Sequence, residues 1–382
     1  DPDAFPGEKP SKIADFFDVE KFPGKRGVHT WANGFIQMAL VADGVAPNGV
    51  YKVLKGQTGA VDRAFGVMDK IKDHIVHWSA GAKPLELVKS GEVVMSIAYN
   101  GRVGAAVLSE GLPYIQRFYG KTIVVKYGGA VMSKKSLKNG FARDIALMKL
   151  VGMNPVIIHG GGPQIGKELR KYGLKSKFVS GLRVTNKKTM KVVKKVLGKE
   201  VNGELVSLIK KYGAKSFSTT NLNKLIIKAS KLKTEDEVDL GLVGKVNSVK
   251  REEIKKIIDK GLIPVIPPLG YNKLGECLNI NADLVAGKVA SSLKSEKLIL
   301  LTDVEGIKDK KNDLLSRITL KQASKLISSE IVLDGMKPKL ESCLQAINSG
   351  VKSCHIIDGR LPHAVLLEVL TDEGVGTLIS SE

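Results

Sequence analysis

Two short apolar runs that each end in a cluster of glycines set the strongest limit on how this chain can fold. Thr122–Lys126 stops at the glycine pair 128–129, and Pro155–His159 stops at the glycine run 160–162, after which a helical pattern covers Gln164–Tyr172. Continuous apolar strands that alternate with helices are typical of a parallel sheet covered on both faces. In open sheets of this kind, ligands bind beyond the carboxyl ends of the strands. The sequence therefore predicts an α/β fold with both glycine clusters at its ligand-binding edge.

The glycine clusters have the chemistry of phosphate-binding loops. Without Cβ atoms the backbone can approach a phosphate closely, its N–H groups can donate to the oxygens, and a following helix adds the positive end of its dipole. One glycine turn after a strand is a weak signal, because any tight turn favours glycine. Two such turns, one of them preceded by Lys126, are more specific. The chain has no GxxxxGK[ST] motif, and the run 160–166 lacks the later acidic residue of a dinucleotide fingerprint.

Two further clusters place polar side chains beside expected element boundaries. Arg183 lies next to a glycine turn, and arginine suits a carboxylate because it can donate two parallel hydrogen bonds. An ordinary surface salt bridge is the alternative. The alternating residues Asn279, Asn281 and Asp283 precede a helix that runs to Leu293. From spacing alone, Asn281 or Asp283 could equally be a plain N-cap.

Lysines also stand at the start of a later expected helix, which opens in the run 334–339. Because Lys337 and Lys339 oppose the dipole at a helix N-terminus, an anionic partner is a natural explanation. A solvated run of charges is the alternative. The expected strand Lys297–Leu301 ends in Thr302 and Asp303 at the same edge of the sheet.

Charge divides the chain into two unlike parts near residue 104. The net charge is +21, but residues 1–103 hold 13 Lys and Arg against 12 Asp and Glu, so the excess belongs to the rest. The lysines are scattered along helical faces without interleaved aromatics, which favours a solvated surface over a nucleic-acid partner. No apolar run approaches the ~20 residues of a membrane span. Three cysteines without CxxC spacing argue against a disulfide framework or zinc site. We expect a cytoplasmic protein with no membrane or nucleic-acid partner and no metal site.

The part before residue 104 has many turn signals and no phosphate-type glycine loop. We expect helices over Phe35–Ala42 and Ala60–His74 and a strand over Glu92–Ala98. Residues 1–103 resemble extracellular solute-binding proteins of the polyamine-transport type. The matching runs are 14–18, 22–26, 39–45, 77–82, 90–93 and 100–102. The resemblance implies an α/β fragment of a periplasmic-binding-protein-like fold, in which Trp78 lines a ligand cleft or belongs to the core.

The remainder carries a second, more specific resemblance. Residues 106–382 are similar to the acetylglutamate kinases of the amino-acid kinase family. The motifs that match, in chain order, are 126–129, 159–163, 181–185, 279–283, 301–306 and 334–339. The resemblance implies a three-layer αβα fold around an open, mainly parallel sheet. It also implies transfer of the γ-phosphoryl of ATP, with Mg²⁺ on the ATP phosphates, to the side-chain carboxylate of N-acetyl-L-glutamate, a step of arginine biosynthesis that gives N-acetylglutamyl 5-phosphate.

The same resemblance assigns parts and roles. The kinase domain would span residues 104–382, with an N-terminal helix over about 104–119, a substrate-binding part over about 120–275 and a nucleotide-binding part over about 276–382. Lys126 and Lys339 would neutralise the transferring phosphoryl, and Asp283 would hold both lysines. The remaining implied residues are Gly128, Gly129, Gly160, Gly161 and Gly162 for the phosphate, and Gly161, Gly162, Arg183 and Asn279 for the acid. Because a carboxylate nucleophile is already ionised at pH 7, no general base is required, and His159 is interpreted as structural.

A further resemblance concerns regulation. The run 107–118 is similar to the N-terminal helix of arginine-inhibited, hexameric members of the family, and the C-terminal runs 355–360 and 371–374 are similar to their arginine site. The residues that would contact inhibitory arginine are Tyr114, His355, Glu368 and Gly374. A core tyrosine and a solvated histidine are the alternatives. We expect a homo-oligomer, either a hexamer or a dimer.

Three other functions stay open on the sequence. The enzyme could be another amino-acid kinase that acts on glutamate, aspartate or carbamate, although the motifs around Arg183 and Asn279 count against this. The first hundred residues could act as a polyamine or other solute sensor. A catalytically dead arginine sensor is the third alternative, and it conflicts with the presence of every lysine and glycine that transfer requires.

Overall fold

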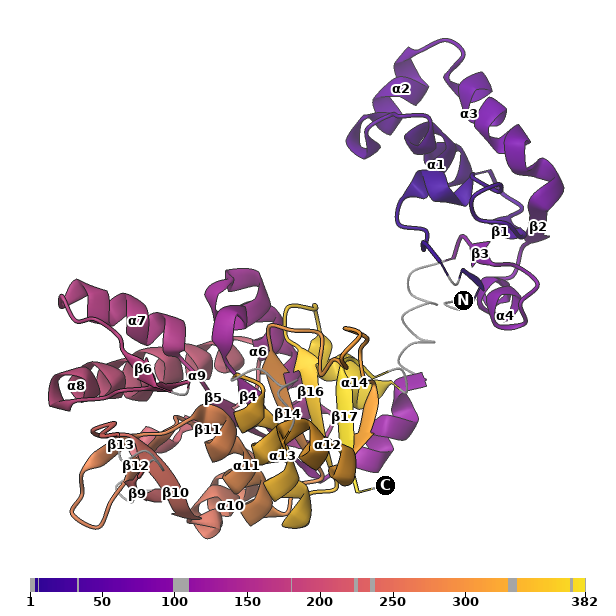
Figure 1. The fold of residues 1–382 in the computed structure, drawn as a ribbon. Helices are drawn as coiled ribbons and strands as arrows, with labels where there is room; N and C mark the ends of the chain where they lie inside the picture. The colour runs from indigo at the N-terminus through magenta and orange to yellow at the C-terminus, as the bar shows by residue number, and fades with distance from the viewer. Residues whose placement is uncertain are drawn as a thin grey trace. The chain divides into compact units, whose positions relative to one another are not determined.

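The computed structural model of the chain describes residues 4–5, 7–32, 34–98, 110–179, 181–222, 226–233, 238–328, 335–371 and 374–381. The chain forms two compact units, Asp1–Glu110 and Gly111–Glu382 (Figure 1). The seam that we expect near residue 104 lies among residues 99–109, outside the described residues. The exact division into domains therefore stays a prediction.

The first unit is built on a three-stranded parallel sheet in the order β2-β1-β3. Its strands are β1 (Arg26–His29), β2 (Ile75–Trp78) and β3 (Met95–Ser96), and its α-helices are α1 (Phe35–Ala42), α2 (Val50–Gly56), α3 (Ala60–Met68) and α4 (Lys83–Lys89). The expected helix Phe35–Ala42 is confirmed, and the helix expected from Ala60 continues past Met68 as a 3₁₀ segment to His74. The expected strand Glu92–Ala98 is too long. Strand β3 starts only at Met95, because the Val93 N–H closes the end of α4 by donating to the Leu87 carbonyl.

The second unit contains an eight-stranded sheet in the order β15-β17-β16-β14-β4-β5-β11-β8. In that order the strands are Arg317–Thr319, Thr377–Ser380, Ser353–Asp358, Lys297–Thr302, Thr122–Tyr127, Asn154–His159, Ile263–Ile266 and Ser216–Ser218. The β16–β17 pair is antiparallel, and the other described pairs are parallel. Strands β4 and β5 pair in register, with Tyr127 opposite His159, so that their two glycine clusters begin at the same level.

Successive side chains of a strand point to opposite faces of the sheet, so each central strand contributes to two separate apolar layers. In β4, Ile123 and Val125 pack into one core while Val124 packs into the other, and all three are fully buried. The first layer is covered by α6 (Lys135–Leu150), α7 (Gly162–Lys171), α8 (Lys187–Lys195), α9 (Asn202–Lys211) and α14 (Ala364–Leu370). The second is covered by α10 (Arg251–Asp259), α11 (Ala282–Leu293), α12 (Leu320–Ser328) and α13 (Lys337–Asn348). The expected three-layer αβα fold with a mainly parallel sheet is confirmed.

Smaller elements complete the second unit. A four-stranded sheet has the order β10-β9-β12-β13, with bounds Gly244–Val249, Ile227–Lys231, Leu269–Tyr271 and Cys277–Asn279. Strands β6 (Phe178–Val179) and β7 (Leu182–Arg183) form an antiparallel pair. A π-helical turn, Val196–Val201, joins α8 to α9. Residues 110–118 are helical, and residues 104–109 of the expected N-terminal helix lie outside the described part of the chain.

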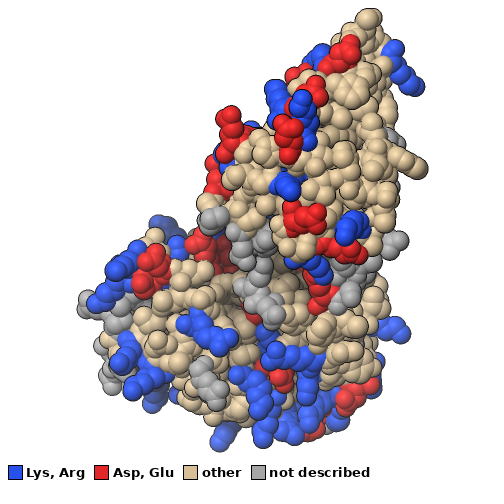
Figure 2. All heavy atoms as spheres, turned by 90° about the vertical axis from the view of Figure 1, so that its right-hand side faces the viewer, with Lys and Arg blue, Asp and Glu red and all other residues tan. Residues whose placement is uncertain are grey.

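Basic side chains lie mainly on the second unit. On the face in Figure 2, blue side chains predominate over the Gly111–Glu382 unit, whereas blue and red alternate over the other unit. Among the described residues, no helix is both long enough and apolar enough to span a membrane.

The contact between α11 and α13 gives a test of the core packing. A Cβ at Gly287 would lie 2.3 Å from Ser342 Oγ and 3.0 Å from the Ser342 carbonyl oxygen. We therefore expect Gly287→Ala to lower the free energy of unfolding by about 1–3 kcal/mol, as overpacking does. In α6, a Cβ at Gly140 meets nothing within 4 Å. Gly140→Ala should instead stabilise the fold by about 0.5–1 kcal/mol, because alanine is the better helix former. Urea unfolding of the intact chain, followed by circular dichroism, measures both, and a Gly287→Ala variant as stable as the original would contradict the packing described.

Candidate active site

The two glycine clusters meet at the carboxyl ends of β4 and β5. The Gly160 N–H donates to the Tyr127 carbonyl over 2.7 Å, which ties the second cluster to the end of the neighbouring strand. A Cβ at Gly128 would lie 3.2 Å from Gly160 Cα, so the two backbones are in close approach. Gly129 has a φ of +76°, a left-handed conformation that favours glycine. Helix α7 starts at Gly162, so its positive end also lies at this edge.

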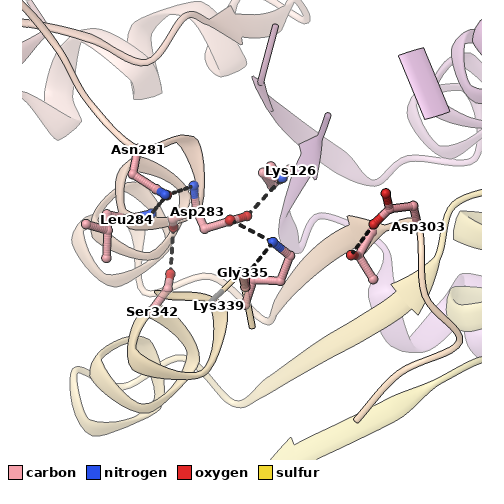
Figure 3. A network of polar contacts seen from close by, with 9 residues as sticks. Lys126, Asn281, Asp283, Leu284, Asp303, Gly335, Lys339 and Ser342 are labelled. Atoms are coloured by element: carbon pink, nitrogen blue, oxygen red, sulfur yellow. Dashed lines mark hydrogen bonds and ion pairs between the residues drawn. The ribbon is translucent and has the colours of Figure 1, made fainter. Parts of the chain in front are cut away.

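A carboxylate shared by two lysines lies beside these loops (Figure 3). Asp283 Oδ1 is 3.0 Å from the ammonium of Lys126, and Asp283 Oδ2 is 3.1 Å from that of Lys339. The side chains are almost closed to solvent, with exposed fractions of 7% for Asp283, 9% for Lys126 and 13% for Lys339. Burial alone would raise the pKa of Asp283, but the two ammonium groups outweigh it and hold the pKa below its usual value. The cluster is thus two cations around one anion, with a net positive charge.

Three separate elements hold this cluster in place. Lys126 comes from β4, Asp283 from the first turn of α11 and Lys339 from the first turn of α13. Asn281 caps α11 by accepting from the N–H groups of Asp283 and Leu284, so its N-cap interpretation is confirmed. The Ser342 hydroxyl donates to the Asp283 carbonyl over 2.6 Å and links α13 to α11. The expected lysines at a helix start are therefore present, with Lys339 directed at Asp283. Asp334 of the same motif lies outside the described residues.

A small cavity next to the second glycine cluster gathers the residues expected to hold the acid. About 160 Å³ in volume, it is lined by Gly160, Gly161, Gly162, Ile165, Phe178, Gly181, Leu182, Arg183, Leu197, Val243, Pro268, Asn279, Ile280, Asn281 and Ala282. Arg183 donates to the Gly162 carbonyl over 3.1 Å and also to the Ser176 hydroxyl, and its guanidinium carbon lies 4.6 Å from the centre of the Phe178 ring. The Asn279 amide donates to Thr185 Oγ1 over 3.2 Å. The cavity thus combines a cation, an amide and apolar walls.

The end of β14 adds two polar side chains to this edge. Thr302 Oγ1 donates to the Asp303 carboxylate over 3.4 Å, and Asp303 is drawn in the same view as the lysine cluster in Figure 3. The strand itself, expected over Lys297–Leu301, extends to Thr302. Among the described residues, no group of three or more His, Cys, Asp and Glu side chains is placed to hold a metal ion.

The four residues expected to contact arginine line one separate cavity. Tyr114, His355, Glu368 and Gly374 border a space of about 590 Å³. The His355 ring donates from Nδ1 to Glu368 over 2.6 Å, and Lys297 lies 3.2 Å from the same carboxylate oxygen. Burial would raise the pKa of Glu368, but His355 and Lys297 together hold it below its usual value.

Two supporting residues escaped the sequence analysis. Ser342 lies on α13 one turn beyond Lys339, and no sequence signal distinguishes it from an ordinary helical serine. Lys297 lies in the second cavity, where its ammonium is 5.3 Å from the centre of the Phe118 ring. A lysine that opens an otherwise apolar strand is a signal that could have found it.

The Asp283 cluster gives a stability test with a defined pH dependence. Asp283→Asn leaves two largely buried ammonium groups without a counter-charge, so we expect a loss of about 3–5 kcal/mol in the free energy of unfolding at neutral pH. Because the pKa of Asp283 is lowered in the fold, its stabilisation is present above the usual value of 3.8 and is lost as the pH falls below it. The difference between the two proteins should therefore shrink below that pH.

The matched control for this test is Asp259→Asn at the exposed end of α10. It should change the free energy of unfolding by no more than about 0.5 kcal/mol. Urea unfolding from neutral to acidic pH measures both variants. A difference for Asp283→Asn that stays constant across the acidic range would contradict the ionised carboxylate described.

Comparison with known proteins agrees with this geometry. A family model described as the amino acid kinase family matches residues 121–358. The chain is 50% identical over 285 residues to the acetylglutamate kinase of Hahella chejuensis, covering 72% of this chain and 94% of that enzyme. It is 51% identical over 287 residues to the acetylglutamate kinase of Saccharophagus degradans, covering 73% and 96%.

Two further matches were found, one to a solved structure and one to a family model that covers the first unit. A solved N-acetylglutamate synthase from Neisseria gonorrhoeae superposes with a TM-score of 0.66 at 25% identity, over 73% of this chain and 63% of that one. A family model described as bacterial extracellular solute-binding protein matches residues 1–139 and so overlaps the start of the kinase match.

Proposed function

The chain belongs to the amino acid kinase family, and on that basis we propose that it is an ATP-dependent acetylglutamate kinase. Its reaction transfers the γ-phosphoryl of ATP to the side-chain carboxylate of N-acetyl-L-glutamate, a step in arginine biosynthesis. The observation that carries the proposal is the 50% identity over 94% of an acetylglutamate kinase. The convergence of both glycine loops with the Lys126–Asp283–Lys339 cluster supports it.

For this reaction the protein must position the two substrates and stabilise the negative charge of the transferring group. A carboxylate oxygen of the acid attacks the γ-phosphorus, the bond from that phosphorus to the bridging oxygen breaks, and ADP leaves as the acyl phosphate forms. The nucleophile is already ionised at neutral pH, so no proton needs to be removed. Because negative charge spreads over the transferring group, fixed cations and N–H donors provide most of the rate enhancement. In this proposal Mg²⁺ would enter with the substrate as MgATP and would supply further positive charge for the ATP phosphates.

The roles of individual residues follow from their places. Lys126 and Lys339 neutralise charge on the transferring phosphoryl, and Asp283 holds both lysines at the correct positions. Backbone N–H groups around Gly129 and at Gly161 and Gly162 bind the moving phosphate, whereas the Gly160 N–H donates to the Tyr127 carbonyl and ties the loop to β4. In the small cavity Arg183 binds the α-carboxylate of the substrate, and Asn279 binds its acetamido group. An ionised guanidinium suits a carboxylate because of its paired donors.

Acceptor comparison separates this function from its relatives. The intact chain with MgATP should convert N-acetyl-L-glutamate to an acyl phosphate, trapped as the hydroxamate, much faster than L-glutamate, L-aspartate or carbamate. Preference for one of those acceptors would replace the proposed function with another amino-acid kinase. If the folded protein transfers phosphate to none of them, and spermidine raises its melting temperature, a solute sensor would be the better description.

Lys126 gives the sharpest test of the catalytic roles. Lys126→Ala should lower kcat by about 100- to 1,000-fold, the range seen when one stabilising group is lost from a transition state. Lys256→Ala, which removes a lysine whose side chain is 66% exposed on α10, is the matched control and should leave kcat unchanged. The hydroxamate assay measures both. Near-normal turnover in Lys126→Ala would refute the role given to this lysine.

We further propose that arginine inhibits the enzyme from the 590 Å³ cavity. Its rim contains the buried carboxylate of Glu368, a suitable partner for a guanidinium, and Tyr114 from the helix over residues 110–118. The same helix would join copies of the chain into a dimer or hexamer, and the enzyme would work in the cytoplasm, where ATP is available.

The arginine site is tested by titrating arginine into the hydroxamate assay. Tyr114→Ala should raise the arginine concentration for half-inhibition by about tenfold, the equivalent of one lost contact of about 1.4 kcal/mol, while activity without arginine persists. Activity of the unaltered chain that is indifferent to arginine would contradict the proposal.

A further inference from the structure

Two fully buried polar side chains lie behind the second glycine cluster. His159 ends β5 and Asn202 begins α9, and both have no solvent exposure. Their surroundings are the apolar layer that contains Ile157, Val201 and Val265. Burying polar groups destabilises a fold unless they are hydrogen-bonded, so their bonds show what they do.

The hydrogen bonds determine which nitrogen of His159 carries the proton. Asn202 Nδ2 lies 3.2 Å from the Val265 carbonyl oxygen and 3.1 Å from His159 Nε2. Because a carbonyl can only accept, the amide nitrogen is the donor to both, and Nε2 is an acceptor. The proton of the neutral ring is therefore on Nδ1, which donates to the Gly160 carbonyl over 2.8 Å. A neutral ring agrees with the burial of His159, which lowers its pKa to about 4.

This chain of bonds fixes one peptide group of the phosphate loop. The Gly160 N–H is already held by the Tyr127 carbonyl, and its C=O is held by His159. In a planar trans peptide the C=O and the following N–H point in opposite directions. Holding the Gly160 carbonyl toward the buried ring therefore directs the Gly161 N–H to the other side, away from the ring. Peptide groups between glycines rotate easily, and the hydrogen bond from His159 to the Gly160 carbonyl prevents the Gly161 N–H from turning.

The segment that supplies Asn202 touches the loop at a second point. Asn202 directly follows the π-helical turn Val196–Val201, and such turns often occur at functional sites. Within this turn, Leu197 packs so closely on Gly161 that a Cβ there would lie 2.5 Å from Leu197 Cδ2. The turn thus contacts Gly161 through Leu197, and the residue that follows the turn is linked to the Gly160 carbonyl through His159.

Asn202 also has a feature that packing alone does not explain. Its Oδ1 atom is buried and has no hydrogen-bond partner among the residues that the structure describes. A buried acceptor without a partner destabilises the fold, so a role in packing alone would favour an apolar residue at this position. Asn202 offsets this cost with the hydrogen bonds that it donates to the Val265 carbonyl and to His159 Nε2, and the second of these bonds sets the tautomer of the ring.

We propose that Asn202 is a positioning residue for phosphoryl transfer, which acts through the Nδ1–H tautomer of His159 to aim the Gly161 N–H at the transferring group. The inference rests on the proposed function, because that function supplies the group at which the N–H is aimed. An N–H donor of this kind matters most when charge develops in the transition state. Loss of Asn202 should therefore lower kcat and leave KM for both substrates little changed.

Kinetics of three variants test the coupling. Asn202→Leu and His159→Leu should each lower kcat by about 100-fold, the effect of a misplaced group near the reacting atoms. The double variant should be no slower than either single one, because both remove the same chain of bonds. Asn139→Leu on α6 is the matched control. It removes two side-chain hydrogen bonds, one donated to the Lys135 carbonyl and one accepted from the Tyr212 hydroxyl, and it should leave kcat unchanged. Unaltered kcat in Asn202→Leu, or additive losses in the double variant, would overturn the proposal.

A second readout does not depend on activity. The ¹⁵N spectrum of the histidine rings should show the ring of His159, identified by the signal that is lost in His159→Leu, as a neutral Nδ1–H tautomer at about pH 6. Its shifts should move in Asn202→Leu and stay in place in Asn139→Leu. An Nε2–H tautomer, or a charged ring at that pH, would overturn the inference. An inactive unaltered chain that shows the Nδ1–H signal would instead count against the proposed function.

Discussion

The second unit depends on one carboxylate that forms ion pairs with two lysines away from water. Asp283 holds Lys126 and Lys339 within ion-pair distance although the three come from three different elements. A buried carboxylate with one lysine would be neutral overall, whereas this cluster keeps a positive charge that an anionic ligand can share. The sheet order explains how it assembles, because β4 is central and α11 and α13 pack together on one face. The fold therefore serves to bring distant charges to one sheet edge.

Much of this arrangement could be predicted from the sequence. Strands β4, β5 and β14 are continuous apolar runs, and the glycines that end the first two place both loops at the same edge. Lys126, Arg183, Asn279, Asp283 and Lys339 were found by their motifs. The structure brings Lys126, Asp283 and Lys339 into one ion-paired cluster and places Arg183 and Asn279 in the lining of the small cavity. Their individual functions stay proposals, since proximity alone does not show which atom touches a substrate.

The features that escaped prediction share a physical cause. The bond between Asn202 and His159 joins residues 43 positions apart, and the π-helical turn before Asn202 has the same apolar spacing as an ordinary helix. Ser342 supports Asp283 only because Gly287 lets the two helices approach. In each case a tertiary contact decides, and local sequence carries no record of it.

The central claim is that the lysine cluster and the two glycine loops form one phosphoryl-transfer site. A crystal structure of the intact chain with N-acetyl-L-glutamate and the Mg²⁺ complex of a non-hydrolysable ATP analogue tests it most directly. The account predicts the γ-phosphoryl between the ammonium groups of Lys126 and Lys339, in contact with the backbone at 128–129 and 160–162. The acid should lie in the small cavity with its α-carboxylate on Arg183. Phosphates bound elsewhere, with both lysines still turned only to Asp283, would contradict it.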